Sequence, residues 1–292
     1  MFDKVLICTD FSDGLHRLSQ FIPSLKLAGI KEIVFLHVVP FWEKGIIPQV
    51  DTEKVAAAKT QLAAAISETA SDVKVTIEVE SGKPVDTILK VAQTHESRLI
   101  ILGSQSRSSL TEKLVGSTMA DLSRQTEIPL LVLRPQLFSA YTAEELTLRC
   151  QHLFRSLLIP YNDSKASNYV VKQVKQLAEN QSDKYLQDCQ LCWVLEDIDN
   201  PRSPRRILPE QAEEKLSQIK AELESVNVQV QTEILEGNPI TQILETGVMT
   251  NISAIAVSSG TIGKLQEWLV SSCGAEILRQ SWYPVLFFPF AD

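Results

Sequence analysis

The chain has 292 residues and a net charge of −8, and 44% of its residues are hydrophobic while 22% are charged. That length is typical of about two globular domains, each able to bury its own core. The negative charge argues against a general nucleic-acid binder, and no apolar run reaches the roughly 18 residues that span a bilayer. Five scattered cysteines and the lack of a signal pattern before Val5 predict a cytoplasmic protein with reduced thiols.

The first half alternates short apolar runs with longer amphipathic stretches. Continuous runs such as Leu99-Ile-Ile-Leu102 are typical of strands covered on both faces, as in a parallel sheet. Asp51 or Thr52 is suited to cap the second helix, and Pro84, preceded by Gly82, suits the first turn of the third. The predicted strands are Val5–Thr9, Ile33–Val39, Val73–Val79, Leu99–Gly103 and Leu130–Leu133, and the predicted helices are Ser12–Ala28, Asp51–Ala70, Val85–His95 and Ser117–Thr126.

The second half repeats this series of elements after a connector at residues 138–153, in which Ala143–Cys150 is expected to form a short helix. The predicted domains are therefore residues 1–137 and 154–292. The predicted strands are Leu157–Tyr161, Gln190–Leu195, Val226–Leu235, Ala254–Ser258 and Val285–Phe288, and the predicted helices are Ser164–Glu179, Glu210–Ser225, Ile240–Thr250 and Ser272–Arg279.

The two halves are copies of each other. Gly82-Lys-Pro84 recurs 155 positions later at Gly237-Asn-Pro239. That offset then holds without a gap as far as Pro129 in the first half and its counterpart Pro284 in the second. A repeat this long indicates a duplicated domain. Strands alternating with helices imply right-handed crossovers. The sequence therefore predicts an α/β protein with two tandem, doubly wound, five-stranded parallel sheets.

Ligands of such sheets bind beyond the carboxyl ends of the strands, where the strand order reverses. In the first copy a carboxylate, Asp10, follows Thr9 at the end of the first strand. Small residues after the fourth strand let a backbone approach a phosphate, and N–H groups at a helix start favour an anion. The candidate residues of this second segment are Gly103, Ser106, Arg107, Gly116, Ser117 and Thr118.

The order of elements, Asp10 and the segment Gly103-x-x-Ser106-x9-Gly116-Ser117 resemble the universal stress protein family. Nucleotide-binding members of that family read Gly-x-x-Gly-x9-Gly-Ser/Thr at this segment. The resemblance covers both halves, so the chain is similar to a tandem member with Rossmann-like domains of the adenine nucleotide α-hydrolase type. It implies that Asp10 meets the ribose hydroxyls, that Val38 lies beside the adenine, and that Gly103, Gly116 and Ser117 surround the phosphates.

The first copy departs from the family pattern at Ser106, where the second glycine is expected. If that position needs a positive φ, a serine costs up to about 1–2 kcal/mol in strain, although its hydroxyl could instead donate to a phosphate. Arg107 keeps a cation in the loop, either as a phosphate contact or as a solvent-facing side chain.

The second copy departs further, because Asn162 replaces the aspartate. Its three glycine positions are occupied by Ser258, Thr261 and Ser271. This pattern predicts that the second copy has lost the nucleotide pocket, with a different small ligand as the alternative.

Other signals favour structural roles. Cys189-x-x-Cys192 lies in an apolar strand without a second pair or a nearby histidine, which favours a core position over a metal or redox site. The four histidines show no ligand spacing, and no Walker-type Gly-Lys-Ser/Thr occurs. The aromatics Trp193, Trp268, Trp282 and Tyr283 favour core packing, and exposure of any of them would mark an interface or an apolar pocket.

The predicted function is a stress-response regulatory module whose first domain binds an adenine nucleotide, ATP before AMP or ADP, with or without Mg²⁺. The alternatives are a scaffold that binds no nucleotide and a slow ATPase, the latter disfavoured because Asp10 is the only candidate general base. The resemblance implies an intrachain pseudo-dimer in which Leu130–Leu133 and Val285–Phe288 pair. A homodimer and an unknown protein partner stay open. The net charge and the lack of a long apolar run predict no nucleic acid or membrane partner.

Overall fold

The computed structural model describes residues 2–11, 14–41, 49–66, 72–103, 117–134, 141–181, 183–195, 208–258 and 273–289. The chain forms two compact units, a first unit of Phe2–Gln151 and a second unit of His152–Asp292. Each unit is an α/β layer structure around its own parallel sheet. The predicted fold class is therefore confirmed in each half. The predicted pairing of the two last strands concerns the placement of the units and stays a prediction.

The first unit contains a sheet with the strand order β3-β2-β1-β4-β5. All neighbouring strands in it run parallel, as βαβ crossovers require. Its elements are β1 (Lys4–Cys8), the 3₁₀ helix η1 (Leu15–Phe21), α1 (Ile22–Leu27), β2 (Glu32–Val39), α2 (Thr52–Ile66), β3 (Lys74–Ser81), α3 (Pro84–Thr94), β4 (Leu99–Gly103), α4 (Ser117–Gln125), β5 (Leu130–Leu133) and α6 (Ala143–Gln151).

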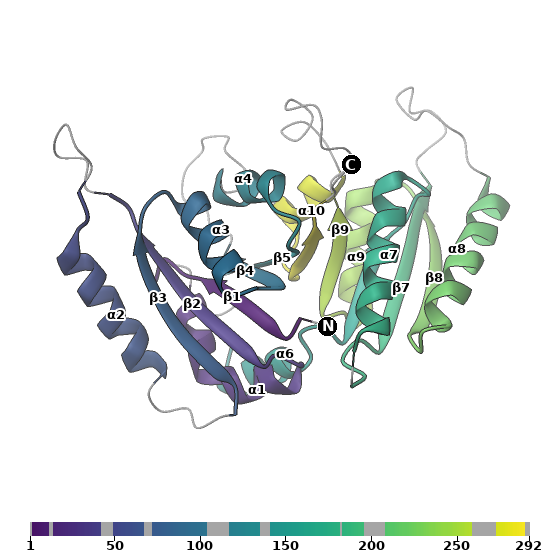
Figure 1. Cartoon of the computed structure of the whole chain (residues 1–292). Coiled ribbons are helices and arrows are strands. Elements are labelled where there is room, and N and C mark those ends of the chain that lie inside the picture. The colour runs from purple at the N-terminus through teal and green to yellow at the C-terminus, as the bar shows by residue number, and fades with distance from the viewer. Residues whose placement is uncertain are drawn as a thin grey trace. The chain divides into compact units, whose positions relative to one another are not determined.

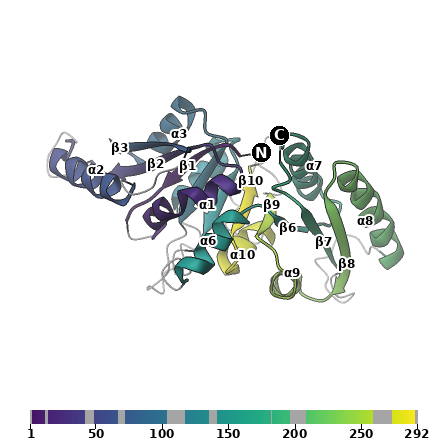
Figure 2. The same cartoon turned by 90° about the horizontal axis from the view of Figure 1, so that it is seen from below.

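Helices cover both faces of this sheet, with α1 and α6 on one face and α3 on the other (Figures 1 and 2). The connector helix α6 packs against α1, so it belongs to the first unit. The strands β1, β4 and β5 are buried along their apolar residues because they are covered from both sides.

The second unit repeats the plan, with the strand order β8-β7-β6-β9-β10. In Figure 1, α7 and α8 lie in front of this sheet and α9 behind it. Its elements are β6 (Ser156–Pro160), α7 (Lys165–Glu179), β7 (Asp188–Leu195), α8 (Pro209–Glu224), β8 (Gln229–Glu236), α9 (Pro239–Met249), β9 (Ala254–Ser258), α10 (Cys273–Gln280) and β10 (Val285–Phe288).

The first predicted helix, Ser12–Ala28, is the clearest departure from the sequence prediction. Its described part is a 3₁₀ helix, η1, followed by the six-residue helix α1, and Ser12 lies outside the described residues. Pro23 stands at the start of α1 and has no N–H with which to continue an α-helical ladder. Gly14 before η1 adopts a left-handed φ of 69°, which breaks the helix at its other end.

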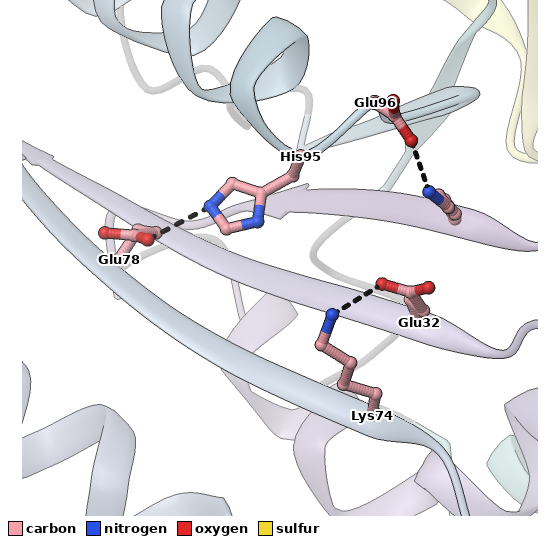
Figure 3. Close-up of polar contacts among 6 residues, drawn as sticks. Glu32, Lys74, Glu78, His95 and Glu96 are labelled. Atoms are coloured by element: carbon pink, nitrogen blue, oxygen red, sulfur yellow. Dashed lines mark hydrogen bonds and ion pairs between the residues drawn. The ribbon is translucent and has the colours of Figure 1, made fainter.

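Polar contacts on the first unit join neighbouring strands to each other and the end of α3 to the sheet (Figure 3). Glu32 on β2 faces Lys74 on β3 at 3.1 Å, directly opposite in the strand register. His95, which caps α3, lies 3.0 Å from Glu78 on β3. Because these groups are partly exposed, each pair contributes no more than about 1 kcal/mol.

Candidate functional site

The strand order of the first unit reverses between β1 and β4. The chain moves outward from β1 through β2 to β3 and then returns to place β4 on the other side of β1. Ile7 of β1 lies opposite Ile101 of β4, so Thr9, which directly follows β1, and Gly103, which ends β4, lie at the same level. Open parallel sheets bind ligands at such a point. Of the predicted site residues, Thr9, Asp10, Val38 and Gly103 lie at this edge.

Thr9 is the anchor of this edge. Its side chain is buried, and its N–H donates to the carbonyl of Leu36 on β2 at 3.0 Å. Its Oγ1 accepts a hydrogen bond from the N–H of Phe11 at 3.1 Å. Asp10 lies between these two anchored residues and is exposed. The turn therefore presents a carboxylate at the switch point.

Phe11 adopts a left-handed φ of 65°, which is rare for an aromatic residue. Its ring lies 4.6 Å, centroid to centroid, from the imidazole of His37 and 6.0 Å from that of His16. His37 also places Nδ1 2.8 Å from the carbonyl oxygen of Thr9. Within the described residues, the buried Nδ1 of His16 has no hydrogen-bond partner. An aromatic cluster thus supports the turn that carries Asp10.

Only some of the other predicted site residues lie within the described part of the chain. Val38 is half-buried in β2, next to His37, and Gly103 closes β4 opposite Leu133. Ser117 and Thr118 begin α4, and the side chain of Thr118 is half-buried. Ser106, Arg107 and Gly116 lie outside the described residues, as does the side chain of Ser117. Their phosphate roles therefore stay predictions.

The matching edge of the second unit keeps the backbone and changes the side chains. The N–H of Tyr161 donates to Cys192 on the neighbouring strand at 2.9 Å, as Thr9 does to Leu36. The Tyr161 and Trp193 rings meet edge to face at 5.4 Å, and both are buried. Large aromatic side chains therefore fill the positions that Thr9 and His37 occupy in the first unit.

A polar network completes this second edge. The Tyr161 hydroxyl lies 2.7 Å from Oδ1 of Asn168 and 3.2 Å from Oδ1 of Asp163. Lys215 on α8 approaches Oδ2 of Asp163 at 3.5 Å. Asn162, the counterpart of Asp10, accepts from the N–H of Ser164 at 3.3 Å. Each of these side chains therefore has a hydrogen-bond or ion-pair partner within the second unit.

The network also shifts two pKa values. Burial works to raise the pKa of Asp163, but hydrogen bonds from Asn168 and Tyr161 and the charge of Lys215 outweigh it and lower that pKa below its usual range. Burial and the neighbouring Asp163 raise the pKa of Tyr161. Asp163 is thus held ionised beside a neutral phenol.

Ser258 ends β9 where Gly103 ends β4. Its hydroxyl is buried and donates to the carbonyl oxygen of Phe288 at 2.6 Å. A side chain therefore stands where the first copy has only a hydrogen, and its polar atom is already bonded. The Ser258 side chain therefore adds a structural reason to the sequence-based prediction that the second copy has lost the nucleotide pocket.

The remaining sequence signals resolve into core and surface positions. Cys189 and Cys192 are buried, and burial raises the pKa of Cys192 to about 11, which confirms the core prediction for this pair. Trp193 is a core residue, but Trp282 is 64% exposed at a position where the first copy has Glu127. Trp268 lies outside the described residues.

Within the described part of the chain, no three His, Cys, Asp or Glu side chains gather as metal ligands. No helix there has both the length and the apolar character to cross a membrane.

Neither His37 nor Phe11 is among the predicted site residues. His37 falls within the predicted strand Ile33–Val39, and it does lie in β2. Its bond to Thr9 arises from the pairing of β1 with β2, and no motif around either residue signals it.

Comparison with known proteins gives one consistent result. The model described as the universal stress protein family matches residues 1–134 and 153–289. A universal stress protein from Methanocaldococcus jannaschii is 24% identical over 157 aligned residues, covering 46% of this chain and 96% of that protein.

Two solved structures match nearly the whole chain. One is a universal stress protein from Archaeoglobus fulgidus, with a TM-score of 0.70, 18% identity and 98% coverage of both chains. The other is a provisionally named universal stress protein from Pseudomonas aeruginosa, with a TM-score of 0.62, 14% identity, and coverage of 98% of this chain and 93% of that one. At these identities the likeness concerns the fold.

Proposed function

The chain belongs to the universal stress protein family, and from that premise we propose that its first domain binds an adenine nucleotide as a regulatory signal. ATP is the preferred ligand, ahead of ADP and AMP, with Mg²⁺ as a companion of the phosphates. Occupancy of the site changes the order of the surrounding loops and thereby the contacts available to a protein partner. The second domain acts as a structural companion without a nucleotide.

One observation carries the proposal. An exposed carboxylate, Asp10, stands at the switch point of the first sheet beside Gly103, which has no side chain to fill the edge. A carboxylate accepts hydrogen bonds from vicinal hydroxyls, which suits a ribose. The start of α4 at Ser117 supplies backbone N–H groups that favour a phosphate. These groups fit a nucleotide, and the second domain lacks the same combination.

The test uses the full-length protein and two matched variants, Asp10→Ala in the first domain and Asn162→Ala at the equivalent position of the second. Hydrogen bonds to a charged group contribute about 1.5–3 kcal/mol, so we expect Asp10→Ala to weaken ATP binding by roughly 10- to 150-fold. Asn162→Ala should leave the affinity unchanged. Isothermal titration calorimetry with ATP and Mg²⁺ measures both effects.

A denaturing extraction of freshly purified protein identifies the bound nucleotide by chromatography and mass. An empty extract together with no heat of ATP binding would overturn the proposal and favour the scaffold alternative. Release of phosphate from ATP by the wild type, abolished in Asp10→Ala, would instead support the slow ATPase.

A further inference from the structure

The contact between His37 and Thr9 bears on how Asp10 is directed. The Nδ1 atom of His37 lies 2.8 Å from the carbonyl oxygen of Thr9. A backbone carbonyl only accepts hydrogen bonds, so Nδ1 must carry the proton in this contact. The imidazole is therefore fixed in one orientation across the gap between β1 and β2.

This bond continues the strand pairing past the point where the ladder ends. The last paired residues of β1 and β2 are Cys8 and Leu36. Beyond them the N–H of Thr9 donates to the carbonyl of Leu36, and Nδ1 of His37 donates to the carbonyl of Thr9. The backbone of Thr9, the residue before Asp10, is consequently held at both its N–H and its C=O.

His37 also supports the residue after Asp10. An aromatic residue at a φ of 65° costs about 1–2 kcal/mol relative to an ordinary conformation. The Phe11 ring stacks on His37 at 4.6 Å with a tilt of 40°, a geometry that is favourable for aromatic pairs. Strain that persists because the surroundings hold it is characteristic of functional sites.

On the basis of the proposed nucleotide site, we propose that His37 is a positioning residue that aims the Asp10 carboxylate at the ribose hydroxyls. One side chain fixes Thr9 by a hydrogen bond and Phe11 by ring contact, and these two residues flank Asp10 in the chain. Val38, the predicted neighbour of the adenine, is the next residue of the same strand. His37 therefore links the two parts of the site that hold the nucleoside.

The second unit supplies an internal comparison. At the positions of Thr9 and His37 it has Tyr161 and Trp193, which contact each other edge to face. Among the described residues, no hydrogen bond joins residue 193 to the carbonyl of residue 161. The left-handed position is filled by Asp163 at a φ of 55°, and aspartate adopts that conformation readily. The side-chain hydrogen bond to the strand-end carbonyl and the left-handed aromatic residue occur together in the first unit, and neither is found among the described residues at this edge of the second.

The test is a ligand and variant cycle on the full-length protein. ATP carries both ribose hydroxyls, and 2′,3′-dideoxy-ATP lacks them. We expect wild-type protein to bind ATP about tenfold more tightly, because of the two nucleotides only ATP carries ribose hydroxyls that can donate to the Asp10 carboxylate. In His37→Phe, which keeps a ring for Phe11 but loses the donor to Thr9, this preference should fall to about twofold or less.

Two further variants separate positioning from general destabilisation. His37→Asn retains an N–H donor near the place of Nδ1, so it should restore most of the preference for ATP. His95→Phe removes a histidine of the same unit that bonds Glu78 instead (Figure 3) and should behave as wild type.

Equal weakening of both nucleotides in His37→Phe, with the preference intact, would overturn the positioning role while leaving the nucleotide site in place. Failure of the wild-type protein to bind ATP at all would overturn the proposed function itself. The two failures are therefore distinguishable in one set of titrations.

Discussion

The ends of β1 and β6 are built on the same backbone. In both, the first residue after the strand donates its N–H to the neighbouring strand, through Thr9 in one and Tyr161 in the other. In both, the residue two positions later is left-handed. The side chains differ, since the first edge exposes Asp10 on a strained turn and the second is closed by aromatic rings and a polar network.

This difference indicates that the two copies share their backbone conformation at the strand end while their side chains have diverged. The left-handed turn and the strand register follow from the fold and are shared. A buried tyrosine and tryptophan stabilise the second unit at the place where the first keeps small or polar residues. Under the proposed function, stability and ligand binding compete for the same positions, as they do in other proteins.

The largest effect is expected at Trp193, the buried ring that closes the second edge. Trp193→Ala should lower the free energy of unfolding of the second unit by about 3–5 kcal/mol, because it leaves a cavity against Tyr161. Guanidinium unfolding followed by circular dichroism measures the change. Trp282→Ala, which removes a 64% exposed ring, should stay within about 0.5 kcal/mol. Equal losses for the two variants would contradict the assignment of Trp193 to the core.

A smaller effect is expected at Ser258, which replaces the glycine of the first copy. Ser258→Ala leaves the buried carbonyl of Phe288 without its 2.6 Å donor and should cost about 1–2 kcal/mol. Ser225 makes a similar bond to Glu222 at 2.7 Å but is exposed, so Ser225→Ala should cost well under that amount. Identical unfolding midpoints for wild type and Ser258→Ala would show that this bond does not stabilise the edge.

The smallest effect concerns the charge of Asp163. Its pKa is lowered in the folded state, so its contribution to stability is present above the ordinary aspartate pKa of about 3.9 and is lost as pH falls through the lowered value. Asp163→Asn keeps the left-handed turn and removes the charge, and should cost about 1 kcal/mol at pH 7 because the carboxylate is partly exposed.

Urea unfolding of both proteins at several pH values provides the readout. The difference between wild type and Asp163→Asn should shrink steadily as pH falls below about 4. A difference that is the same at pH 3 and pH 7 would assign the effect to packing instead of charge.

Much of this fold follows from the sequence. The strands Leu99–Gly103, Leu130–Leu133, Ala254–Ser258 and Val285–Phe288 have their predicted bounds, because each is a continuous apolar run that the parallel sheet buries. The prediction of one α-helix at Ser12–Ala28 was wrong over η1, which is a 3₁₀ helix. Pro23 removes one backbone N–H from the hydrogen-bond ladder, and the periodicity of apolar residues carries no information about such a local loss. The Asp51 cap was correct, with its Oδ1 accepting from Lys54 at 3.0 Å.

The candidate site was predictable only in part. Asp10 and Gly103 could be placed at one edge because parallel strands end together at a known switch point. The bond from His37 to Thr9 could not, because it depends on side-chain orientation across two paired strands. Nor could the closing of the second edge by Tyr161 and Trp193, since an apolar strand pattern does not say whether an aromatic ring will cover the strand end.

The most direct measurement is the number of ATP molecules bound per chain, determined by equilibrium dialysis of the full-length protein with labelled ATP and Mg²⁺. The difference between the two edges predicts saturation at a single nucleotide, bound with unchanged affinity in Asn162→Ala and lost in Asp10→Ala. Saturation at two nucleotides per chain, or a single nucleotide that persists in Asp10→Ala, would contradict the assignment of binding to the first domain.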